Sequence, residues 1–427
     1  MKFHAIEFPP NGKNTSQNSF KRLFLTLTLI FFTSIPLYLI RKSQSPLPPQ
    51  EIDISSLRKN REVLKKCDIF KGKWVPHPEG PYYTNETCPL IIDQHNCMKF
   101  GRPDTEFMRW RWKPDECELP YFDAVQFLEL VRGKSMAFLG DSVGKNQMHS
   151  LLCLLSSVAS PEDVSSKYSS DTTYFTHWFY ADYNFTLASL WSPFLVTSRD
   201  ADLNGYSYDS YMSLYIDEAD KGWTGEIEGY DYVIISAGHW FFRPLYLHEK
   251  GQLVGCHKCS VKNITSLSVY HGYRMAFRTA FRTLLSLKRY KGVTFLRTFS
   301  PAHFENADWD KGGNCLRTKP FTNQERKSDD YIWEFYLTQV EEVRAAEDEG
   351  RKRGLQFVLL NTTEIMWLRP DGHPSQFGHS RHRNETVNDC VHWCLPGPID
   401  TWNELLLYMM KMGVLKGRER KLMKNYI

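Results

Sequence analysis

A serine between an apolar run and a helical pattern is the first candidate for chemistry. Ser135 to Leu139 is a short, mostly apolar run that predicts a buried strand, and Gly140-Asp141-Ser142 interrupts it. Apolar residues then recur at helical spacing from Val143 to Leu155, so Ser142 falls where helix N–H groups have no internal partner. A nucleophilic serine there could use free amides, its own first, to stabilise an oxyanion. The alternative is that Asp141 and Ser142 only cap the helix.

A carboxylate and an imidazole near the other end of the chain could supply the base. Asp389 precedes His392 by three residues. An aspartate can hold one ring nitrogen and stabilise the imidazolium while the other nitrogen takes the serine proton. The alternative is a buried structural histidine beside Cys390 and Cys394. The order Ser, Asp, His, with the last two close together near the C-terminal end, resembles the site of SGNH/GDSL-type hydrolases and acyltransferases.

The cysteines indicate an oxidising compartment, since all ten follow residue 66. Four of them lie in a turn-rich stretch that we expect to be a disulfide-stapled N-terminal subdomain: Cys67, Cys88, Cys97 and Cys117. Two further pairs have spacings that zinc sites also use, Cys256 with Cys259 and Cys390 with Cys394. We expect these four cysteines and Cys315 to form disulfides, with their partners left open, and expect no metal. Cys153, inside the apolar helix, is expected to be a free core thiol.

An apolar stretch near the start predicts a membrane anchor. Leu23 to Ile40 lies between basic pairs and is just long enough to span a bilayer, although a cleaved signal peptide is the rival interpretation. Five Asn-x-Ser/Thr sequons follow it and are expected glycosylation sites: Asn85, Asn184, Asn263, Asn361 and Asn384. Together with the cysteines they predict a single-pass type II protein with a lumenal catalytic part. The short span favours the Golgi membrane.

The remaining pattern predicts an α/β fold. Lys and Arg exceed Asp and Glu by 53 − 49 = 4 with no long basic run, which excludes nucleic acid as a partner. From residue 121 onward, predicted strands and helices alternate, which is typical of a parallel sheet whose active sites gather beyond the C-terminal strand ends. The expected strands are at 174–180, 185–190, 212–216, 232–237, 293–299 and 356–360, and the expected helices at 122–131, 270–287, 329–350 and 401–412.

Five segments are distinctive when taken together: Gly140-Asp141-Ser142, 236–242, 297–306, 369–374 and 389–400. They resemble the plant trichome birefringence-like family, whose members are Golgi polysaccharide O-acetyltransferases with a PC-esterase fold. The likeness runs from Cys67 to Met412. It implies an SGNH/GDSL-like three-layer fold with a parallel central sheet. The expected organisation is a cytosolic tail (1–22), a transmembrane signal anchor (23–40), a stem (41–66), a Cys-rich subdomain (67–120), a PC-esterase-like catalytic domain (121–415) and a basic C-terminal tail (416–427).

The resemblance also implies roles for individual residues. Ser142 is the nucleophile, His392 the general base and Asp389 its orienting carboxylate. Ser142 takes acetyl from a donor, and a sugar hydroxyl then attacks the acetyl-serine. The candidates for oxyanion or substrate binding are Gly140, Asn146, Gly238, His239 and Trp240. Trp240, Phe241 and Phe242 are candidates for an aromatic acceptor groove, and the alternative is that they are core aromatic residues beside the strand.

The resemblance is nearest to the branch that acetylates xyloglucan and, in close relatives, mannan. It implies a cell-wall polysaccharide acceptor, the Golgi membrane as attachment, no bound cofactor, and an acetyl donor as co-substrate, for which acetyl-CoA is a candidate. Two other hypotheses stay open. One is an acetylesterase that uses the same triad with water as acceptor, and the other is a wall-polysaccharide binding protein without catalysis.

Overall fold

The computed structural model describes residues 67–201, 210–259, 261–322, 325, 330–378 and 388–424, with side chains described to residue 413. The expected cytosolic tail, membrane anchor and stem, and the sequon at Asn384, lie outside the described residues. Within the described ranges, no helix combines the length and the apolar character that crossing a membrane requires.

A seven-stranded sheet forms the centre of the α/β region, in the order β13-β12-β9-β3-β6-β5-β4. The five strands from β13 to β6 are parallel, whereas β5 and β4 at one edge are antiparallel. The expectation of a parallel sheet is therefore corrected at that edge, because only residues 181–184 join β5 to β6, too few for a crossover. The strands are β3 (Ser135–Gly140), β4 (Glu162–Asp163), β5 (Thr176–Tyr180), β6 (Phe185–Trp191), β9 (Tyr232–Ser236), β12 (Val293–Arg297) and β13 (Gln356–Leu360).

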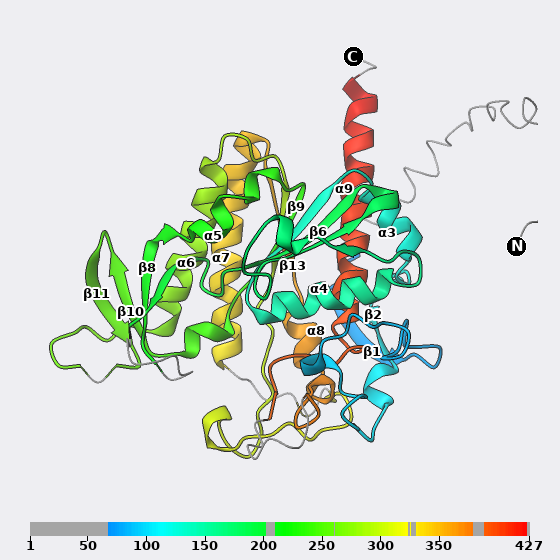
Figure 1. The fold of residues 1–427 in the computed structure, drawn as a ribbon, viewed down its shortest axis with the longest axis horizontal. Helices are drawn as coiled ribbons and strands as arrows, with labels where there is room; N and C mark the ends of the chain where they lie inside the picture. Colours follow the sequence, from blue (N-terminus) through cyan, green and yellow to red (C-terminus); the bar gives the residue numbers. More distant parts are fainter. Residues whose placement is uncertain are drawn as a thin grey trace, which may run out of the picture. The chain divides into compact units, whose positions relative to one another are not determined.

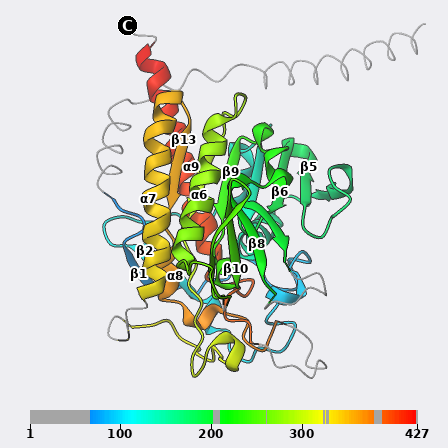
Figure 2. The ribbon, with the colours of Figure 1, turned by 90° about the vertical axis from the view of Figure 1, so that its left-hand side faces the viewer.

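Helices cover both faces of this sheet, which explains why β3 and β9 are buried almost throughout. Figure 1 shows the sheet between α6 and α7 on one side and α4 and α9 on the other, and Figure 2 shows α6 and α7 side by side. The helices are α3 (Ala124–Leu130), α4 (Ser142–Leu155), α5 (Lys221–Thr224), α6 (Val269–Ser286), α7 (Asp330–Arg353), α8 (Thr363–Trp367) and α9 (Asp400–Lys424). Since α9 continues to Lys424, the segment expected as a C-terminal tail begins within a helix.

Eight 3-10 helices connect these elements. They are η1 (Asp93–His95), η2 (Glu106–Met108), η3 (Ser165–Lys167), η4 (Ala181–Tyr183), η5 (Ile227–Gly229), η6 (His239–Phe242), η7 (Trp309–Lys311) and η8 (Pro370–Gly372). This count refers to the described ranges of the chain. Two of them, η1 and η6, come close to the candidate active site.

A second, four-stranded sheet was not anticipated. Its order is β11-β10-β8-β7, and α6 packs against β8. The run expected at 212–216 belongs to this sheet and not to the central one, because β8 pairs with β10 and β7. The strands are β7 (Val196–Asp200), β8 (Met212–Ala219), β10 (Leu245–Glu249) and β11 (Gln252–His257).

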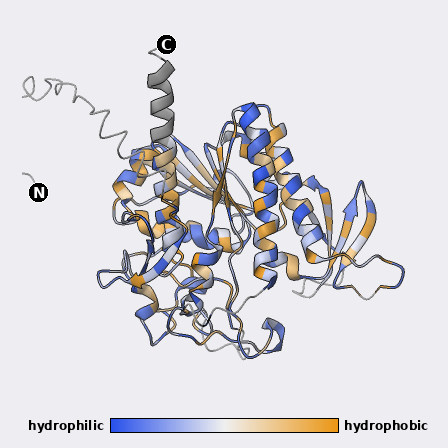
Figure 3. Cartoon of the chain, turned by 180° about the vertical axis from the view of Figure 1, so that it is seen from behind, coloured by the Kyte–Doolittle hydropathy of each residue, from blue (hydrophilic) through white to orange (hydrophobic). Residues whose placement is uncertain are grey.

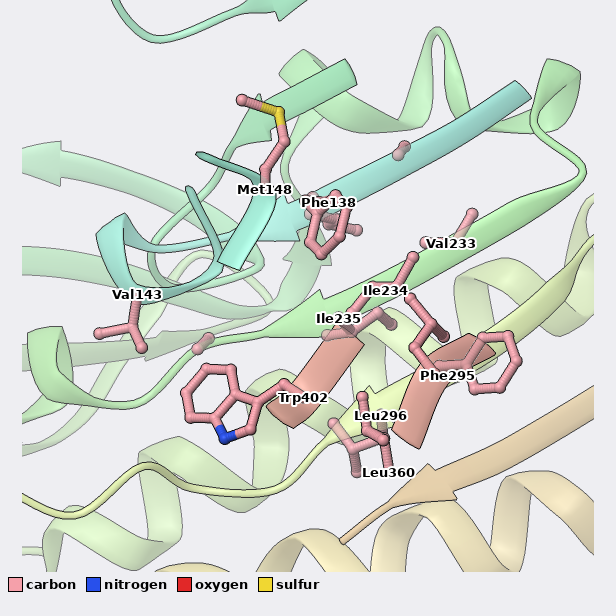
Figure 4. Packing of buried hydrophobic residues seen from close by; sticks show 14 of the residues in the cluster. Phe138, Val143, Met148, Val233, Ile234, Ile235, Phe295, Leu296, Leu360 and Trp402 are labelled. Atoms are coloured by element: carbon pink, nitrogen blue, oxygen red, sulfur yellow. The ribbon is translucent and has the colours of Figure 1, made fainter. Parts of the chain in front are cut away.

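The core lies between the central sheet and the helices. Figure 4 shows Val143 and Met148 of α4 and Trp402 of α9 near apolar side chains of β3, β9, β12 and β13. In Figure 3 the central strands are mostly apolar while the outer surface of α7 is polar. The same cluster contains Phe277 of α6 and Phe335 of α7, so the central sheet is packed by helices on both faces.

The N-terminal region, residues 67–118, packs with the α/β region as one compact unit. Its two strands, β1 (Gly72–Pro76) and β2 (Trp110–Pro114), pair antiparallel. Cys67–Cys117 closes the region on itself, whereas Cys88–Cys153 joins it to α4. The expectation that Cys153 is a free thiol is therefore wrong: α4 buries one side against Cys88, and no described cysteine is unpaired.

Three further disulfides complete the set, Cys97–Cys394, Cys256–Cys259 and Cys315–Cys390. Among the described sequons, Asn184 and Asn263 are exposed and Asn85 is half-buried. Asn361 differs, because its side-chain amide donates to the Tyr336 hydroxyl at 3.2 Å. A glycan on Asn361 would have to replace that hydrogen bond.

Candidate active site

A sharp turn places Ser142 at the end of the central strand. Gly140 ends β3 with φ of 141°, in the region that favours glycine, and a Cβ there would overlap the carbonyl oxygen of Ser236 on β9. Asp141 caps α4, since its Oδ1 accepts from the N–H groups of Val143 and Gly144 at 3.1 and 3.4 Å. Ser142 is partly exposed between buried neighbours. Both early interpretations of this tripeptide therefore apply, because Asp141 is the cap and Ser142 is presented.

Ser142, His392 and Asp389 form one hydrogen-bonded chain. Ser142 Oγ lies 2.7 Å from His392 Nε2, and His392 Nδ1 lies 2.8 Å from Asp389 Oδ2. A carboxylate only accepts, so Nδ1 carries the proton and Nε2 keeps a lone pair for the serine hydroxyl. The other oxygen of Asp389 accepts from the backbone N–H groups of Val391 and His392 at 3.1 and 2.9 Å. The structure thus brings together, in the order needed for proton transfer, three residues that the sequence places up to 250 positions apart.

Asp389 and His392 each stabilise the charged form of the other. Burial alone would raise the pKa of Asp389, but the neighbouring His392 and the hydrogen bonds from Val391 and His392 hold it well below its ordinary value. Burial works against protonation of His392, but the charge and hydrogen bond of Asp389 outweigh it and raise the pKa of the imidazole. Asp389 is therefore ionised, and His392 is basic enough to take a hydroxyl proton.

Asn146 occupies a different position from that expected of an oxyanion donor. Its Oδ1 accepts from the Trp393 N–H at 2.8 Å and its Nδ2 donates to the Trp393 carbonyl at 3.2 Å. These two bonds tie α4 to the residue that follows His392, so Asn146 fixes the distance between serine and base. Among the described residues, none accepts a hydrogen bond from the Ser142 N–H, which leaves that amide available to an oxyanion.

Gly140 and Gly238 are closely packed. The Gly140 carbonyl accepts from the Ser192 N–H at 2.9 Å, so Gly140 shapes the turn. Gly238 follows β9, and a Cβ there would lie 2.6 Å from the ring of Phe299. Both glycines permit the close approach of neighbouring strands at the edge that carries Ser142.

The four residues of η6, one histidine and three aromatic candidates, differ in their surroundings. His239 Nε2 donates to the Ser300 carbonyl at 2.9 Å, and burial lowers the pKa of His239 to about 3, so it is neutral. Trp240 is half-buried, with its ring centroid 5.5 Å from that of Trp191. Phe241 is fully buried, which agrees with the alternative of a core aromatic residue, whereas Phe242 lines a cavity.

That cavity has a volume of about 1270 Å³ and is lined by His239 of η6 and by Val391. Val391 lies in the loop that carries His392, residues 389–395, here called the base loop. Aromatic rings and charges of both signs line it, among them Phe304, Trp309 and Arg317. A space of this size, lined by the residue that precedes His392, can hold an extended polar molecule such as a sugar chain. Among the described residues, no group of three or more His, Cys, Asp or Glu side chains is placed to hold a metal ion.

Two features of the site were missed from the sequence. The side chain of Gln94, in η1 of the N-terminal region, contacts both Asp389 and His392. Beneath the turn, the buried Arg297 guanidinium donates to the Ser236 hydroxyl and lies near Asp141. No local pattern marks Gln94, because 295 residues separate it from Asp389, although the nearby Cys97 could have indicated a crosslink.

Comparisons with known proteins agree with this arrangement. Residues 119–409 match the family described as a GDSL/SGNH-like acyl-esterase family found in Pmr5 and Cas1p, and residues 65–118 match the PMR5 N-terminal domain. The chain is 47% identical to trichome birefringence-like protein 19 of Arabidopsis thaliana over 97% of each chain. It is 46% identical to xyloglucan O-acetyltransferase 4 of Populus trichocarpa over 81% of each chain, and 39% identical to xyloglucan O-acetyltransferase 2 of Arabidopsis thaliana over 90% of each.

The resemblance drawn from the sequence motifs is therefore confirmed. A full-length match to trichome birefringence-like proteins accompanies an α/β fold of mixed sheets and an N-terminal region held by disulfides. This chain belongs to the GDSL/SGNH-like acyl-esterase (PC-esterase) family, among its trichome birefringence-like members.

Proposed function

We propose that this protein transfers acetyl groups to hydroxyls of a plant cell-wall hemicellulose, with xyloglucan as the first candidate acceptor and mannan as the second. The observation that carries the proposal is the hydrogen-bonded chain from Ser142 through His392 to Asp389 in a member of this family. Two relatives that are 46% and 39% identical to this chain are named xyloglucan O-acetyltransferases, and this supports xyloglucan as the acceptor.

The first half-reaction acetylates the serine. His392 Nε2 takes the Ser142 proton as Oγ attacks the acetyl carbonyl, and Asp389 stabilises the imidazolium that forms. The carbonyl oxygen becomes an oxyanion, for which the Ser142 N–H at the start of α4 is the nearest donor and Gly238 a second candidate. His392 then returns the proton to the leaving group as the bond between acetyl and donor breaks.

The second half-reaction transfers acetyl to the sugar. His392 takes a proton from an acceptor hydroxyl, whose oxygen attacks the acetyl-serine, and the proton passes to Ser142 Oγ as the ester breaks. The acetyl donor is consumed as a co-substrate, with acetyl-CoA as the candidate, and no bound cofactor takes part in either step.

Sugar must reach the acyl-enzyme faster than water does, which an aromatic surface favours. Three neighbouring aromatic rings, those of Tyr174, Trp191 and Trp240, are candidates for this surface. Trp191 is the last residue of β6 and pairs with Gly140 at the end of β3. Its ring centroid is 5.2 Å from that of Tyr174 and 5.5 Å from that of Trp240. Tyr174 is held there because Lys145 on α4 donates to the carbonyl of Thr173 at 2.7 Å. We assign these three rings to the acceptor, whose pyranose faces can stack on them.

The cellular setting is part of the proposal. Five disulfides join all ten cysteines, which supports a chain that matures in an oxidising lumen. With exposed sequons at Asn184 and Asn263 and the apolar stretch at 23–40, this favours a type II Golgi membrane protein.

The test uses residues 60–427, which contain the compact unit, secreted as wild type and as Ser142→Ala. Each is incubated with an acetyl donor and either xyloglucan or mannan oligosaccharides, and the mass of the oligosaccharide is followed. Gain of acetyl on one glycan, abolished in Ser142→Ala, is the expected result. Loss of acetyl from pre-acetylated glycan without transfer would favour the esterase. Binding of glycan with neither reaction would favour a binding protein.

A further inference from the structure

The loop that carries the base rests on the N-terminal region. Cys97 is bonded to Cys394, two residues after His392. The backbone N–H of Leu395 donates to the carbonyl of His95 at 2.8 Å. The buried Arg102 guanidinium donates to the carbonyls of Asp371 and His373 at 2.6 and 2.7 Å. These ties hold residues 95–102 against residues 371–373 and 394–395.

The side chain of Gln94, which immediately precedes residues 95–102, reaches the site itself. Its Nε2 lies 3.3 Å from Asp389 Oδ2 and 3.0 Å from His392 Nδ1. Because a carboxylate repels a carbonyl oxygen and accepts from N–H, the NH₂ end of the amide must face Asp389. Nδ1 already donates its proton to Oδ2, so the hydrogen bond of Gln94 goes to the carboxylate.

The Asp389 carboxylate consequently receives four N–H groups. Two backbone amides hold Oδ1, while His392 and Gln94 share Oδ2. A second donor on Oδ2 lowers the basicity of that oxygen, which keeps the proton on the imidazole, and opposes rotation of the carboxylate away from His392. Three of the four donors come from the base loop itself, and Gln94 is the one supplied by the N-terminal region.

We propose that Gln94 is a positioning residue of the active site, which holds the Asp389 carboxylate toward His392, so that the N-terminal region completes the catalytic arrangement. The inference rests on the proposed function only in taking His392 as the base that activates Ser142. It assigns a task to the region that matches the PMR5 N-terminal domain, namely supplying part of the site rather than a separate module.

The surroundings of His392 determine what a charge at position 94 would do. The titratable groups near its imidazole are Asp389 on its own loop, Asp141 at the start of α4, His95 in η1 and His239 in η6. Burial keeps His95 and His239 neutral, so the two aspartates are the charges that act on the imidazole. A third carboxylate, introduced as Gln94→Glu, would favour the imidazolium further.

The experiment uses the full chain in detergent micelles and two readouts. The first is the rate at which a fluorophosphonate probe labels Ser142 between about pH 5 and pH 9, which reports serine activation without any acetyl transfer. The second is acetyl transfer to oligosaccharide. The variants are Gln94→Ala and Gln94→Glu, with Asp93→Asn as the matched control. Asp93 is the neighbouring residue, and its ion pair with Lys99 at 2.6 Å is exposed.

We expect Gln94→Ala to lower the labelling rate roughly 3- to 10-fold, as loss of one hydrogen bond to a charged group implies. In Gln94→Glu the acidic limb of the labelling profile should move to higher pH by about half a unit to one unit. Asp93→Asn should match the wild type. Gln94→Ala within about two-fold of wild type would overturn the proposal. Loss of rate without movement of the limb in Gln94→Glu would also overturn it, since Gln94 would then only support the fold.

The two readouts distinguish a failure of the proposed function from a failure of the proposed role of Gln94. Wild-type protein that labels at Ser142 but transfers no acetyl would refute the proposed function, while the labelling profiles would still decide the role of Gln94. Because Gln94 is exposed, its variants are expected to fold, and their melting temperatures provide the check.

Discussion

A buried carboxyl between the N-terminal region and α9 makes stability depend on pH in a defined direction. Glu404 is 4% exposed and accepts a hydrogen bond from the Tyr82 hydroxyl. Burial, which the nearby Asp400 reinforces, raises the pKa of Glu404 from 4.5 to about 7. The folded chain thus holds this proton more tightly than the unfolded chain. The stability that the proton contributes is complete below the unfolded pKa and is lost as the pH rises through 7.

The perturbation is Glu404→Gln, which removes the titration but keeps an oxygen for Tyr82. The rise in pKa from 4.5 to about 7, at about 1.36 kcal/mol per pKa unit, corresponds to about 3 kcal/mol. Relative to the wild type, the glutamine variant should therefore gain about 3 kcal/mol in the free energy of unfolding between about pH 4.5 and pH 8.

The difference in the free energy of unfolding between the wild type and Glu404→Gln reports on the Glu404 carboxyl alone. Burial lowers the pKa of His149 and His239 to about 3 and that of His303 to about 4. These neutral histidines destabilise the fold as the pH falls below their ordinary value of 6.5, the opposite sign to Glu404. They are common to both proteins, so they cancel in the difference.

Urea unfolding followed by tryptophan fluorescence, at steps from about pH 5 to pH 8, measures that difference. A difference between variant and wild type that stays constant with pH would refute the reasoning, because Glu404 would then titrate alike in both states. The reasoning would also be refuted if the free energy of unfolding of the wild type increased relative to that of the variant as the pH rises. In that case the folded state would favour the ionised carboxyl.

Three further predictions concern the site. Trp191→Ala should lower the ratio of acetylated glycan to free acetate by about 5-fold, because the loss of about 1 kcal/mol of stacking favours hydrolysis of the acetyl-enzyme over transfer. An unchanged ratio would show that Trp191 does not belong to the acceptor site. Gly140→Ala should destabilise the chain by about 3 kcal/mol or more, because the Cβ meets the Ser236 carbonyl; the control is Gly133→Ala, a positive-φ position with open space, and equal unfolding midpoints would contradict the argument. Replacing both Cys97 and Cys394 with alanine should lower the free energy of unfolding by about 2–5 kcal/mol and reduce serine labelling; full labelling in a destabilised variant would separate the crosslink from the site.

Local sequence patterns were sufficient for the residues that act within one turn or loop. The apolar run before Gly140 and the helical period after Ser142 predicted the strand, turn and helix that present the serine. Asp389 and His392 are three residues apart, so their contact needs only one loop. That these two segments meet follows from the family resemblance and from parallel strands ending at one edge, not from either motif alone.

Long-range pairings were not predictable in the same way. Cys153 has the signature of a core helix residue, and nothing in its neighbours indicates that Cys88, 65 positions away, would lie beside it. Phe241 and Trp240 are adjacent aromatic residues, yet packing buries one fully and leaves the other half-exposed. The antiparallel pairing of β5 with β6 could have been predicted, because the connection between the two strands is too short for a crossover.

The contacts of the N-terminal region argue against two separable domains. This region supplies the Tyr82 and Tyr83 hydroxyls to Glu404 and Asp400 on α9, and Cys88 to α4. Without it, two buried carboxyls would lose hydrogen bonds that no apolar contact replaces. The same region reaches the base loop through Cys97 and Gln94. Since the elements it holds, α4 and the base loop, are those that carry Ser142 and His392, the geometry of the catalytic chain depends on the N-terminal region being folded in place.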